Sequence, residues 1–212
     1  LPAEYGCGGM DEMAYGIIMQ ELERGDSGVR SMASVQGSLV MYPIWAFGSE
    51  AQKQTWLPRM ARGEVIGCFG LTEPEFGSNP AGMIVNADET ADGWTLHGTK
   101  KWLSNGPSAH VAVVWAKTNG SDDPKSIRGF LVPTNLPGVT VHRVDDKHSL
   151  RVSESSAMTF DQVKLRLVNE MDSDHPMPHP FHVHGAGRFL ILARDVVVEP
   201  NLVWKDTVLV RT

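Results

Sequence analysis

Groups able to bind a ligand gather in the segment from Cys68 to Pro80, where a short apolar run ends in a loop of small and turn-forming residues. Its glycines let the backbone come close to a ligand, and the hydroxyls of Thr72 and Ser78 both donate and accept hydrogen bonds. Pro74 and Pro80 restrict the backbone. The segment therefore predicts a site for a planar, polar ligand, although an ordinary strand that ends in a turn explains the same residues.

A second polar group places Arg30 beside Ser31 and Ser34. A guanidinium next to hydroxyls suits a carboxylate, because a carboxylate accepts charge-assisted hydrogen bonds in a planar, bidentate geometry. An exposed arginine in a surface salt bridge has the same composition. A carboxylate site and a surface ion pair are therefore both open interpretations of this group.

Histidines crowd the region near the carboxyl end, where half of the eight in the chain fall within ten residues. In an extended segment His182 and His184 project to the same face, and imidazole is a preferred ligand of copper and zinc. Prolines on both sides of His179 restrain its approach. The spacing predicts a metal site at His179, His182 and His184, with a surface cluster or an artificial tag as the alternative.

The elements that position these groups change in type along the chain. Up to about Arg62 the pattern is helical, and Met13, Ile17, Ile18 and Leu22 recur at three- and four-residue spacing that predicts a buried helix face. Trp56, Leu57 and Met60 continue the apolar stripe, and Ser49-Glu50 is a signal for the start of a helix.

After Gly67 apolar residues alternate with polar ones, in runs such as 94–97, 111–115 and 129–132. Asp92-Gly93 is a hairpin signal, and Asn119-Gly120 begins a polar loop. The sequence predicts a multidomain α+β chain in which a helical segment precedes a small antiparallel β domain.

Composition excludes several classes of function. The 212 residues are 42% hydrophobic with a net charge of −6, which suits a globular protein and offers no basic patch for nucleic acid. No apolar run approaches the ~20 residues that cross a bilayer. Cys7 and Cys68 fit no metal or redox spacing, so we expect reduced thiols and no disulfide.

The segments Cys68–Pro80 and Gly98–Asn105 together resemble the two flavin-contacting segments of the acyl-CoA dehydrogenase family. The likeness runs from Leu1 to about Val163 and is greatest to the glutaryl-CoA branch. It implies a partial amino-terminal helical domain at residues 1–66 and a middle β domain at 67–163. It also implies FAD contacts at Phe69, Gly70, Leu71, Thr72, Glu73, Pro74, Gly77, Ser78, Trp102, Leu103 and Ser104.

The same resemblance implies a chemistry. Members oxidise the α,β-carbons of an acyl-CoA thioester, and the glutaryl branch also decarboxylates its substrate. Glutaryl-CoA would contact Arg30, Ser31, Ser34 and Ser78, and the electron acceptor would be an electron-transfer flavoprotein. The catalytic glutamate of relatives lies in a carboxy-terminal helical bundle, so no catalytic residue is assigned in this sequence. Without the resemblance, Trp102 is interpreted as a core aromatic residue.

The family also implies a bacterial cytoplasmic or mitochondrial matrix location and a homotetramer, although the tetramer depends on the carboxy-terminal bundle. The first residues, from Leu1 to Gly6, are typical of the interior of a longer protein.

Residues 164–212 resemble a different family, the multicopper oxidases, and imply a partial cupredoxin-like β segment. In that family His179 would bind the blue copper, while His182 and His184 would bind the trinuclear copper cluster, and members are commonly exported. A copper-binding fragment is therefore the alternative function. A third interpretation is an inactive fusion product whose two parts join near Val163.

Overall fold

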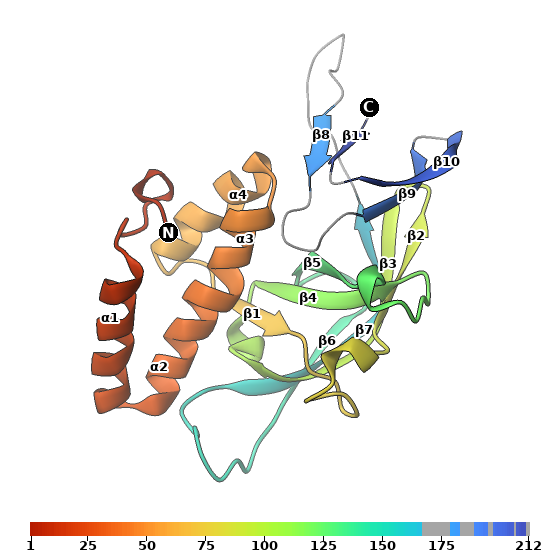
Figure 1. The fold of residues 1–212 in the computed structure, drawn as a ribbon. Coiled ribbons are helices and arrows are strands. Elements are labelled where there is room, and N and C mark those ends of the chain that lie inside the picture. The colour runs from red at the N-terminus through yellow and green to blue at the C-terminus, as the bar shows by residue number, and fades with distance from the viewer. Residues whose placement is uncertain (167–178, 183–188, 195–196, 206, 211–212) are drawn as a thin grey trace.

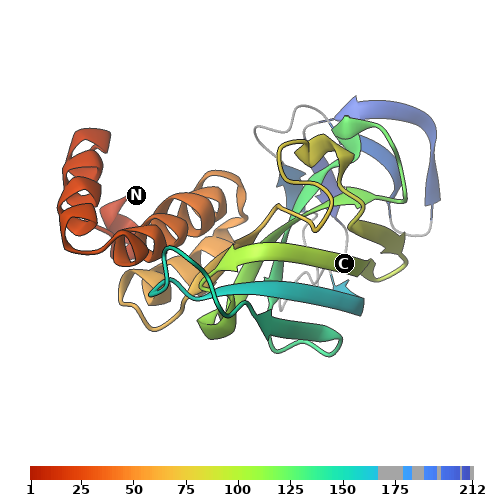
Figure 2. The same cartoon turned by 90° about the horizontal axis from the view of Figure 1, so that it is seen from below.

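The computed structural model describes residues 1–166, 179–182, 189–194, 197–205 and 207–210. A group of helices lies beside a twisted sheet, and the chain passes from the first to the second through β1 (Figures 1 and 2). No helix in these ranges is long and apolar enough to cross a membrane. The helices are α1 (Glu12–Gly25), α2 (Ser27–Ser34), the π-helical stretch η2 (Val35–Met41), α3 (Tyr42–Phe47) and α4 (Glu50–Ala61).

Side-chain caps fix where these helices begin. The Asp11 carboxylate accepts a hydrogen bond from the Ala14 N–H at the start of α1, and Asp26 accepts from two backbone amides at the start of α2. Ser49 and Gln52 form a reciprocal capping box at α4, which confirms the predicted start there. Each cap satisfies backbone donors that the first helical turn leaves free.

The π-helical stretch η2 joins the helices to the sheet. The Gln36 side chain donates to the Val65 carbonyl and accepts from the Gly67 N–H, both at 2.8 Å. A Cβ on Gly67 would lie 2.4 Å from Cγ1 of the buried Val40, so only glycine allows β1 to approach this closely. The helical region is therefore anchored at the first residue of β1.

Seven strands form the main sheet: β1 (Gly67–Gly70), β2 (Asn86–Thr90), β3 (Gly93–Ser104), β4 (Val111–Thr118), β5 (Arg128–Pro133), β6 (Val139–Arg143) and β7 (Ser155–Arg166). The predicted hairpin at Asp92-Gly93 is confirmed between β2 and β3. The predicted antiparallel pairing is confirmed for β2–β3, β3–β7, β4–β5 and β6–β7. The domain is not antiparallel throughout, because β4 pairs in parallel with both β1 and β2. The β2–β3 hairpin lies between β1 and β4 in sequence, and a connection of that length permits a parallel pair.

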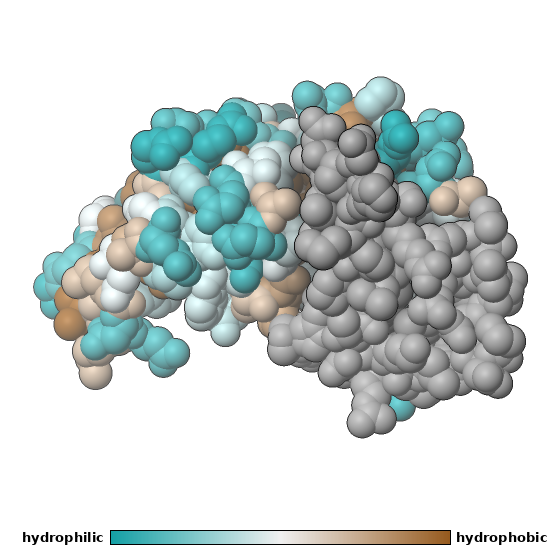
Figure 3. All heavy atoms as spheres, turned by 90° about the horizontal axis from the view of Figure 1, so that it is seen from above, coloured by the Kyte–Doolittle hydropathy of each residue, from teal (hydrophilic) through white to brown (hydrophobic). Residues whose placement is uncertain are grey.

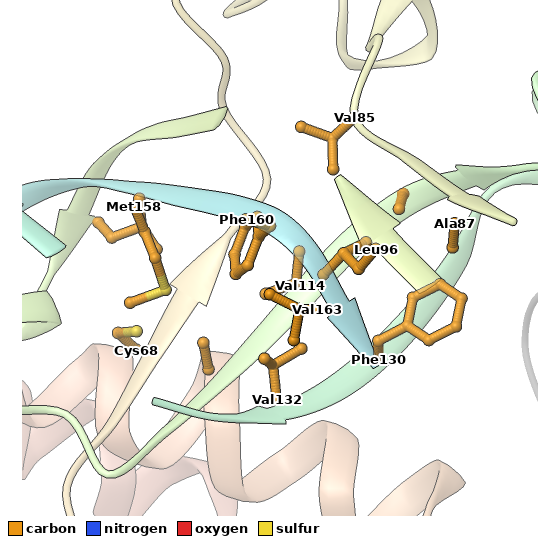
Figure 4. Close-up of a cluster of buried hydrophobic side chains, with 13 residues drawn as sticks. Cys68, Val85, Ala87, Leu96, Val114, Phe130, Val132, Met158, Phe160 and Val163 are labelled. Atoms are coloured by element: carbon orange, nitrogen blue, oxygen red, sulfur yellow. The ribbon is translucent and has the colours of Figure 1, made fainter. Parts of the chain in front are cut away.

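Two hydrophobic clusters stabilise the described fold. One lies within the β domain and contains Met158, Phe160 and Val163 of β7, which face the side chains of β3, β4 and β5 (Figure 4). The other lies between the helices and the sheet, where Leu57 and Met60 of α4 are joined by Val111 and Val113 of β4. The apolar stripe predicted in α4 is therefore core.

Helix α1 was predicted to bury its apolar face, but none of its residues is buried. Met13 is 72% exposed, Ile17 54% and Ile18 45%, and hydrophobic residues appear among polar ones at the helical end of the molecule (Figure 3). The predicted burial of this face was wrong within the described chain. Helical spacing identifies which face is apolar, but it does not say what covers that face.

The segment from Lys147 to Ser153 is a loop between β6 and β7. Asp146 and Leu150 have φ values of 57° and 49°, which break an extended backbone. The Lys147 ammonium donates to the Leu150 carbonyl at 2.9 Å and to the carbonyl of Ser153. The Lys147 side chain therefore stabilises this loop by binding two of its backbone carbonyls.

The described parts of residues 179–210 form two antiparallel pairs. Strand β8 (His179–His182) pairs with β11 (Thr207–Val210), and β9 (Phe189–Arg194) pairs with β10 (Val197–Lys205). His184 and the side chains of His179 and His182 lie outside the described structure. The predicted copper site and the cupredoxin-like segment therefore stay predictions.

Candidate functional site

The two segments predicted to contact a flavin lie side by side. The Lys101 N–H donates to the Thr72 carbonyl at 2.8 Å, which links the loop after β1 to the end of β3. The loop also contains a tight turn, in which Glu73 and Phe76 exchange backbone hydrogen bonds. The loop at Thr72 and the strand at Lys101, about 30 residues apart in sequence, are thus directly hydrogen-bonded.

Trp102 lies on this surface at a bulge in β3. The pairing of β3 with β7 shifts register between Lys101 and Leu103, and Trp102 between them has a φ of 64°. A bulge redirects a side chain that would otherwise follow the strand. The indole is 54% exposed, with the Lys101 ammonium 5.1 Å from its ring centroid. The core interpretation of Trp102 is therefore excluded within the described residues, and an exposed aromatic ring suits stacking against a planar ligand.

The other predicted flavin residues divide by burial. Thr72 and Ser104 are half-buried, while Pro74, Gly77 and Ser78 are exposed. Within residues 1–166, neither the Ser78 hydroxyl nor the Thr72 hydroxyl has a recorded hydrogen bond, and a Cβ on Gly77 would meet nothing within 4 Å. These groups are open to a ligand.

The remaining members of that set support the site from beneath. Leu103 is fully buried in the core of the β domain, and Gly70 is buried against it. The half-buried Phe69 packs toward the helices and makes an edge contact with Trp115 at 6.4 Å between centroids. Half-buried Leu71 contributes a carbonyl to the Lys100 ammonium. These residues shape the loop from below the exposed surface.

Glu73 was predicted as a flavin contact, but its side chain is turned into the protein. It is 2% exposed and forms an ion pair with the fully buried Lys100, at 2.8 Å between Oε1 and Nζ. The carboxylate also accepts from the amides of Ile84 and Val85. The Glu73 side chain therefore binds groups inside the protein and stabilises the loop.

Arg30 extends from α2 with Ser31 and Ser34 close by, as predicted. Its Nε donates to the Glu23 carboxylate at 2.6 Å, and NH1 lies 3.5 Å from the Ser34 hydroxyl. This hydrogen bond lowers the pKa of Glu23. The structure thus shows the salt-bridge interpretation, with Arg30 still one-third exposed and already binding a carboxylate.

Asn105 joins α2 to the second of the two segments predicted to contact a flavin. Its side-chain amide donates to the carbonyls of Met32 and Gly67, each at 3.3 Å, and its backbone N–H donates to the backbone carbonyl of Glu154. The residue is 3% exposed and left-handed, with a φ of 66°. Asparagine tolerates that conformation better than most residues.

Sequence reasoning missed three residues that position this surface: Lys100, Asn105 and Gln36. A lysine in an alternating strand is normally exposed, so composition gave no signal for a buried Lys100. Asn105 did carry a signal, because asparagine at a strand end commonly adopts positive φ. The contacts of Gln36 depend on tertiary structure alone.

Within the described residues no group of three or more histidine, cysteine or acidic side chains is arranged to hold a metal ion. Cys68 is buried, and burial raises the pKa of its thiol to about 12. A thiol protonated at neutral pH is neither a good nucleophile nor a metal ligand. Within the described residues, the candidate ligand-binding groups are therefore Thr72, Ser78, Trp102 and Ser104.

Comparison with known proteins identifies the family of this chain. The model described as "Acyl-CoA dehydrogenase, N-terminal domain" matches residues 1–64, and that described as "Acyl-CoA dehydrogenase, middle domain" matches residues 68–163. Residues 1–163 of the chain therefore belong to the acyl-CoA dehydrogenase family.

Individual proteins similar to this chain cover the same part of it. A glutaryl-CoA dehydrogenase of Mycobacterium smegmatis, solved in complex with FADH2, is 54% identical with a TM-score of 0.73, covering 76% of this chain and 41% of its own. The human short-chain specific acyl-CoA dehydrogenase, mitochondrial, is 39% identical over 165 residues, or 78% of this chain and 40% of the relative. A structure described as the electron transferring flavoprotein of Acidaminococcus fermentans is 32% identical with a TM-score of 0.75, covering 78% of this chain and 44% of its own. The chain thus spans about two-fifths of these proteins' length.

Proposed function

We propose that residues 1–163 form the flavin-facing part of an FAD-dependent acyl-CoA dehydrogenase of the glutaryl-CoA type. The observation that carries this proposal is the junction of the Thr72 loop with the Trp102 bulge, where the Lys101 N–H binds the Thr72 carbonyl next to the exposed Trp102. The relative from Mycobacterium smegmatis, whose structure contains FADH2, supports the choice of cofactor.

The residues present fit a flavin. An isoalloxazine ring has two flat faces and a polar edge, so it can stack on the Trp102 indole while hydroxyls and backbone amides meet its edge. Thr72, Ser78 and Ser104 would supply those hydroxyls. When bound, FAD would supply the hydride acceptor for oxidation of an acyl thioester. The chain's own contribution is to bind and orient the ring.

FAD titration of the purified full chain tests the cofactor. We expect the flavin fluorescence to change with saturation, and Trp102→Ala to weaken binding by about tenfold or more because the stacking face is lost. The matched control is Phe47→Ala, which removes another exposed aromatic residue from α3. No saturable uptake by the unmodified chain would overturn the proposal, as would equal affinity for FAD in Trp102→Ala.

The finer substrate proposal is glutaryl-CoA. It is supported by the 54% identity to a glutaryl-CoA dehydrogenase. The free carboxylate of a dicarboxylic acyl group would replace Glu23 on the guanidinium. Ser31, Ser34 and Ser78 are proposed to complete the contacts to the substrate.

Arg30→Ala is expected to weaken glutaryl-CoA binding to the full chain by about 10- to 100-fold, the range for a lost charge-assisted hydrogen bond, while butyryl-CoA binding changes little. Isothermal titration with both thioesters measures this. Arg24→Ala is the matched control, because Arg24 forms an exposed ion pair with Glu21 within α1. An equal loss for both thioesters in Arg30→Ala would remove the glutaryl assignment.

The electron acceptor proposed for the whole enzyme is an electron-transfer flavoprotein. The chain's likeness to a structure carrying that description supports the choice. No described observation favours the copper-oxidase alternative, and its predicted ligands lie outside the described side chains.

A further inference from the structure

A buried ion pair lies directly beneath the proposed flavin surface. The Lys100 side chain is fully buried, Glu73 is 2% exposed, and 2.8 Å separates Nζ from Oε1. The ammonium also donates to the Leu71 carbonyl at 2.9 Å and lies 3.8 Å from the Met83 sulfur. Removing two charges from water is costly, so a buried pair is weak evidence for stability and stronger evidence for a fixed geometry.

The Glu73 carboxylate also accepts two backbone hydrogen bonds from the far end of the loop that follows β1. Oε2 accepts from the Ile84 amide at 2.7 Å, and Oε1 accepts from the Val85 amide at 3.0 Å. The two ends of the segment 73–85 are thereby joined through one side chain. Gly77 and Ser78, which are exposed, lie inside that segment. Their position depends on how the segment's ends are held.

The same pair sets the loop's position along β3. Lys100 reaches the loop through its side chain, and the next residue, Lys101, reaches it through its backbone N–H to the Thr72 carbonyl. Trp102 follows at the bulge. Two successive residues of β3 therefore attach the loop immediately before the indole.

We propose that Lys100 and Glu73 are positioning residues that hold the segment 71–85 against β3, so that Thr72, Ser78 and Trp102 form one flavin-binding surface. Neither charged group touches the ligand. The inference rests on the proposed function, and it gives the Glu73 side chain an indirect role in flavin binding. Sequence patterns assign no such role to Lys100.

Amide hydrogen exchange and FAD titration on the full chain test this together. In Glu73→Gln, we expect exchange at the Ile84 and Val85 amides to speed up by about tenfold or more, with core amides such as Val114 unchanged. We expect FAD affinity to fall by about tenfold or more, because the ligand must then order the loop itself. If this variant fails to fold, the double variant Glu73→Gln/Lys100→Met removes both buried charges and gives the same readouts.

The matched control is Arg62→Met/Glu64→Gln, which removes an ion pair whose side chains are 58% and 50% exposed. It should change neither exchange at Ile84 nor FAD affinity. Unchanged exchange at Ile84 and Val85 in Glu73→Gln would overturn the inference, as would faster exchange with unchanged FAD affinity. No FAD uptake by the unmodified chain would overturn the proposed function and this inference together, so the two failures are distinguishable.

Discussion

The Glu73→Leu variant is expected to unfold with a free energy about 3–5 kcal/mol lower than that of the unmodified chain. The substitution leaves the Lys100 ammonium buried without its counter-charge, and it leaves two backbone amides, at Ile84 and Val85, without their acceptor. Urea denaturation followed by circular dichroism measures the loss. Loss of an exposed pair such as Arg62–Glu64 should cost less than about 1 kcal/mol.

The same variant should acquire a characteristic dependence on pH. Burial lowers the pKa of Lys100 below its ordinary value of 10.5, while the hydrogen bond and charge of Glu73 oppose that shift. Without Glu73 only the burial remains, so the pKa of Lys100 falls further. Between that folded-state pKa and 10.5 the unfolded chain carries a proton that the folded chain has lost. Stability therefore rises with pH through this window, by up to about 1.4 kcal/mol per pH unit.

The free energy of unfolding, measured at intervals from neutral pH upward, should begin to rise at a lower pH and rise by more in total for Glu73→Leu than for the unmodified chain. The double variant Glu73→Leu/Lys100→Met removes the titrating group, so its stability should follow the rest of the chain with no added rise. It should also recover the part of the lost stability that comes from the unpaired charge, leaving a loss of about 1–3 kcal/mol that reflects the amides left without an acceptor. Parallel pH profiles for the single and double variants would contradict the assignment to Lys100.

Local signals in the sequence predicted the elements that local chemistry controls. Ser49 begins α4 because its hydroxyl caps the helix from a neighbouring position, and Asp92-Gly93 turns the chain because glycine accepts the required φ of 143°. Alternation located β3, β4 and β5 to within a few residues, apart from the carboxyl end of β3. These features need no information from distant parts of the chain.

Features that depend on distant partners were not predictable in the same way. The parallel pairing of β1 with β4 joins Gly67 to Val111, and no short pattern specifies it. The exposed face of α1 has the same spacing as a buried one. In the candidate site, resemblance located the two segments, but burial was needed to separate exposed Trp102 from buried Glu73. The proposed role of Lys100 could be inferred only from its hydrogen-bond partners and its burial in the structure.

Asn105→Ala is expected to lower the free energy of unfolding by about 2–5 kcal/mol, from two separate causes. The buried carbonyls of Met32 and Gly67 lose a donor, at about 1–3 kcal/mol. Alanine is also disfavoured at a φ of 66°, by about 1–2 kcal/mol. Urea denaturation measures the sum.

Two further substitutions separate those causes. Asn105→Gly accepts the left-handed backbone but loses the amide, so it should show only the hydrogen-bond loss and be more stable than Asn105→Ala. Asn105→Asp keeps the shape but turns a carboxylate toward two carbonyl oxygens, so raising the pH through the carboxyl's titration should destabilise it. Asn105 links α2, which carries Arg30, to the segment that carries Trp102. If Asn105→Ala and Asn105→Gly were both as stable as the unmodified chain, that link would not hold the proposed substrate and flavin groups together.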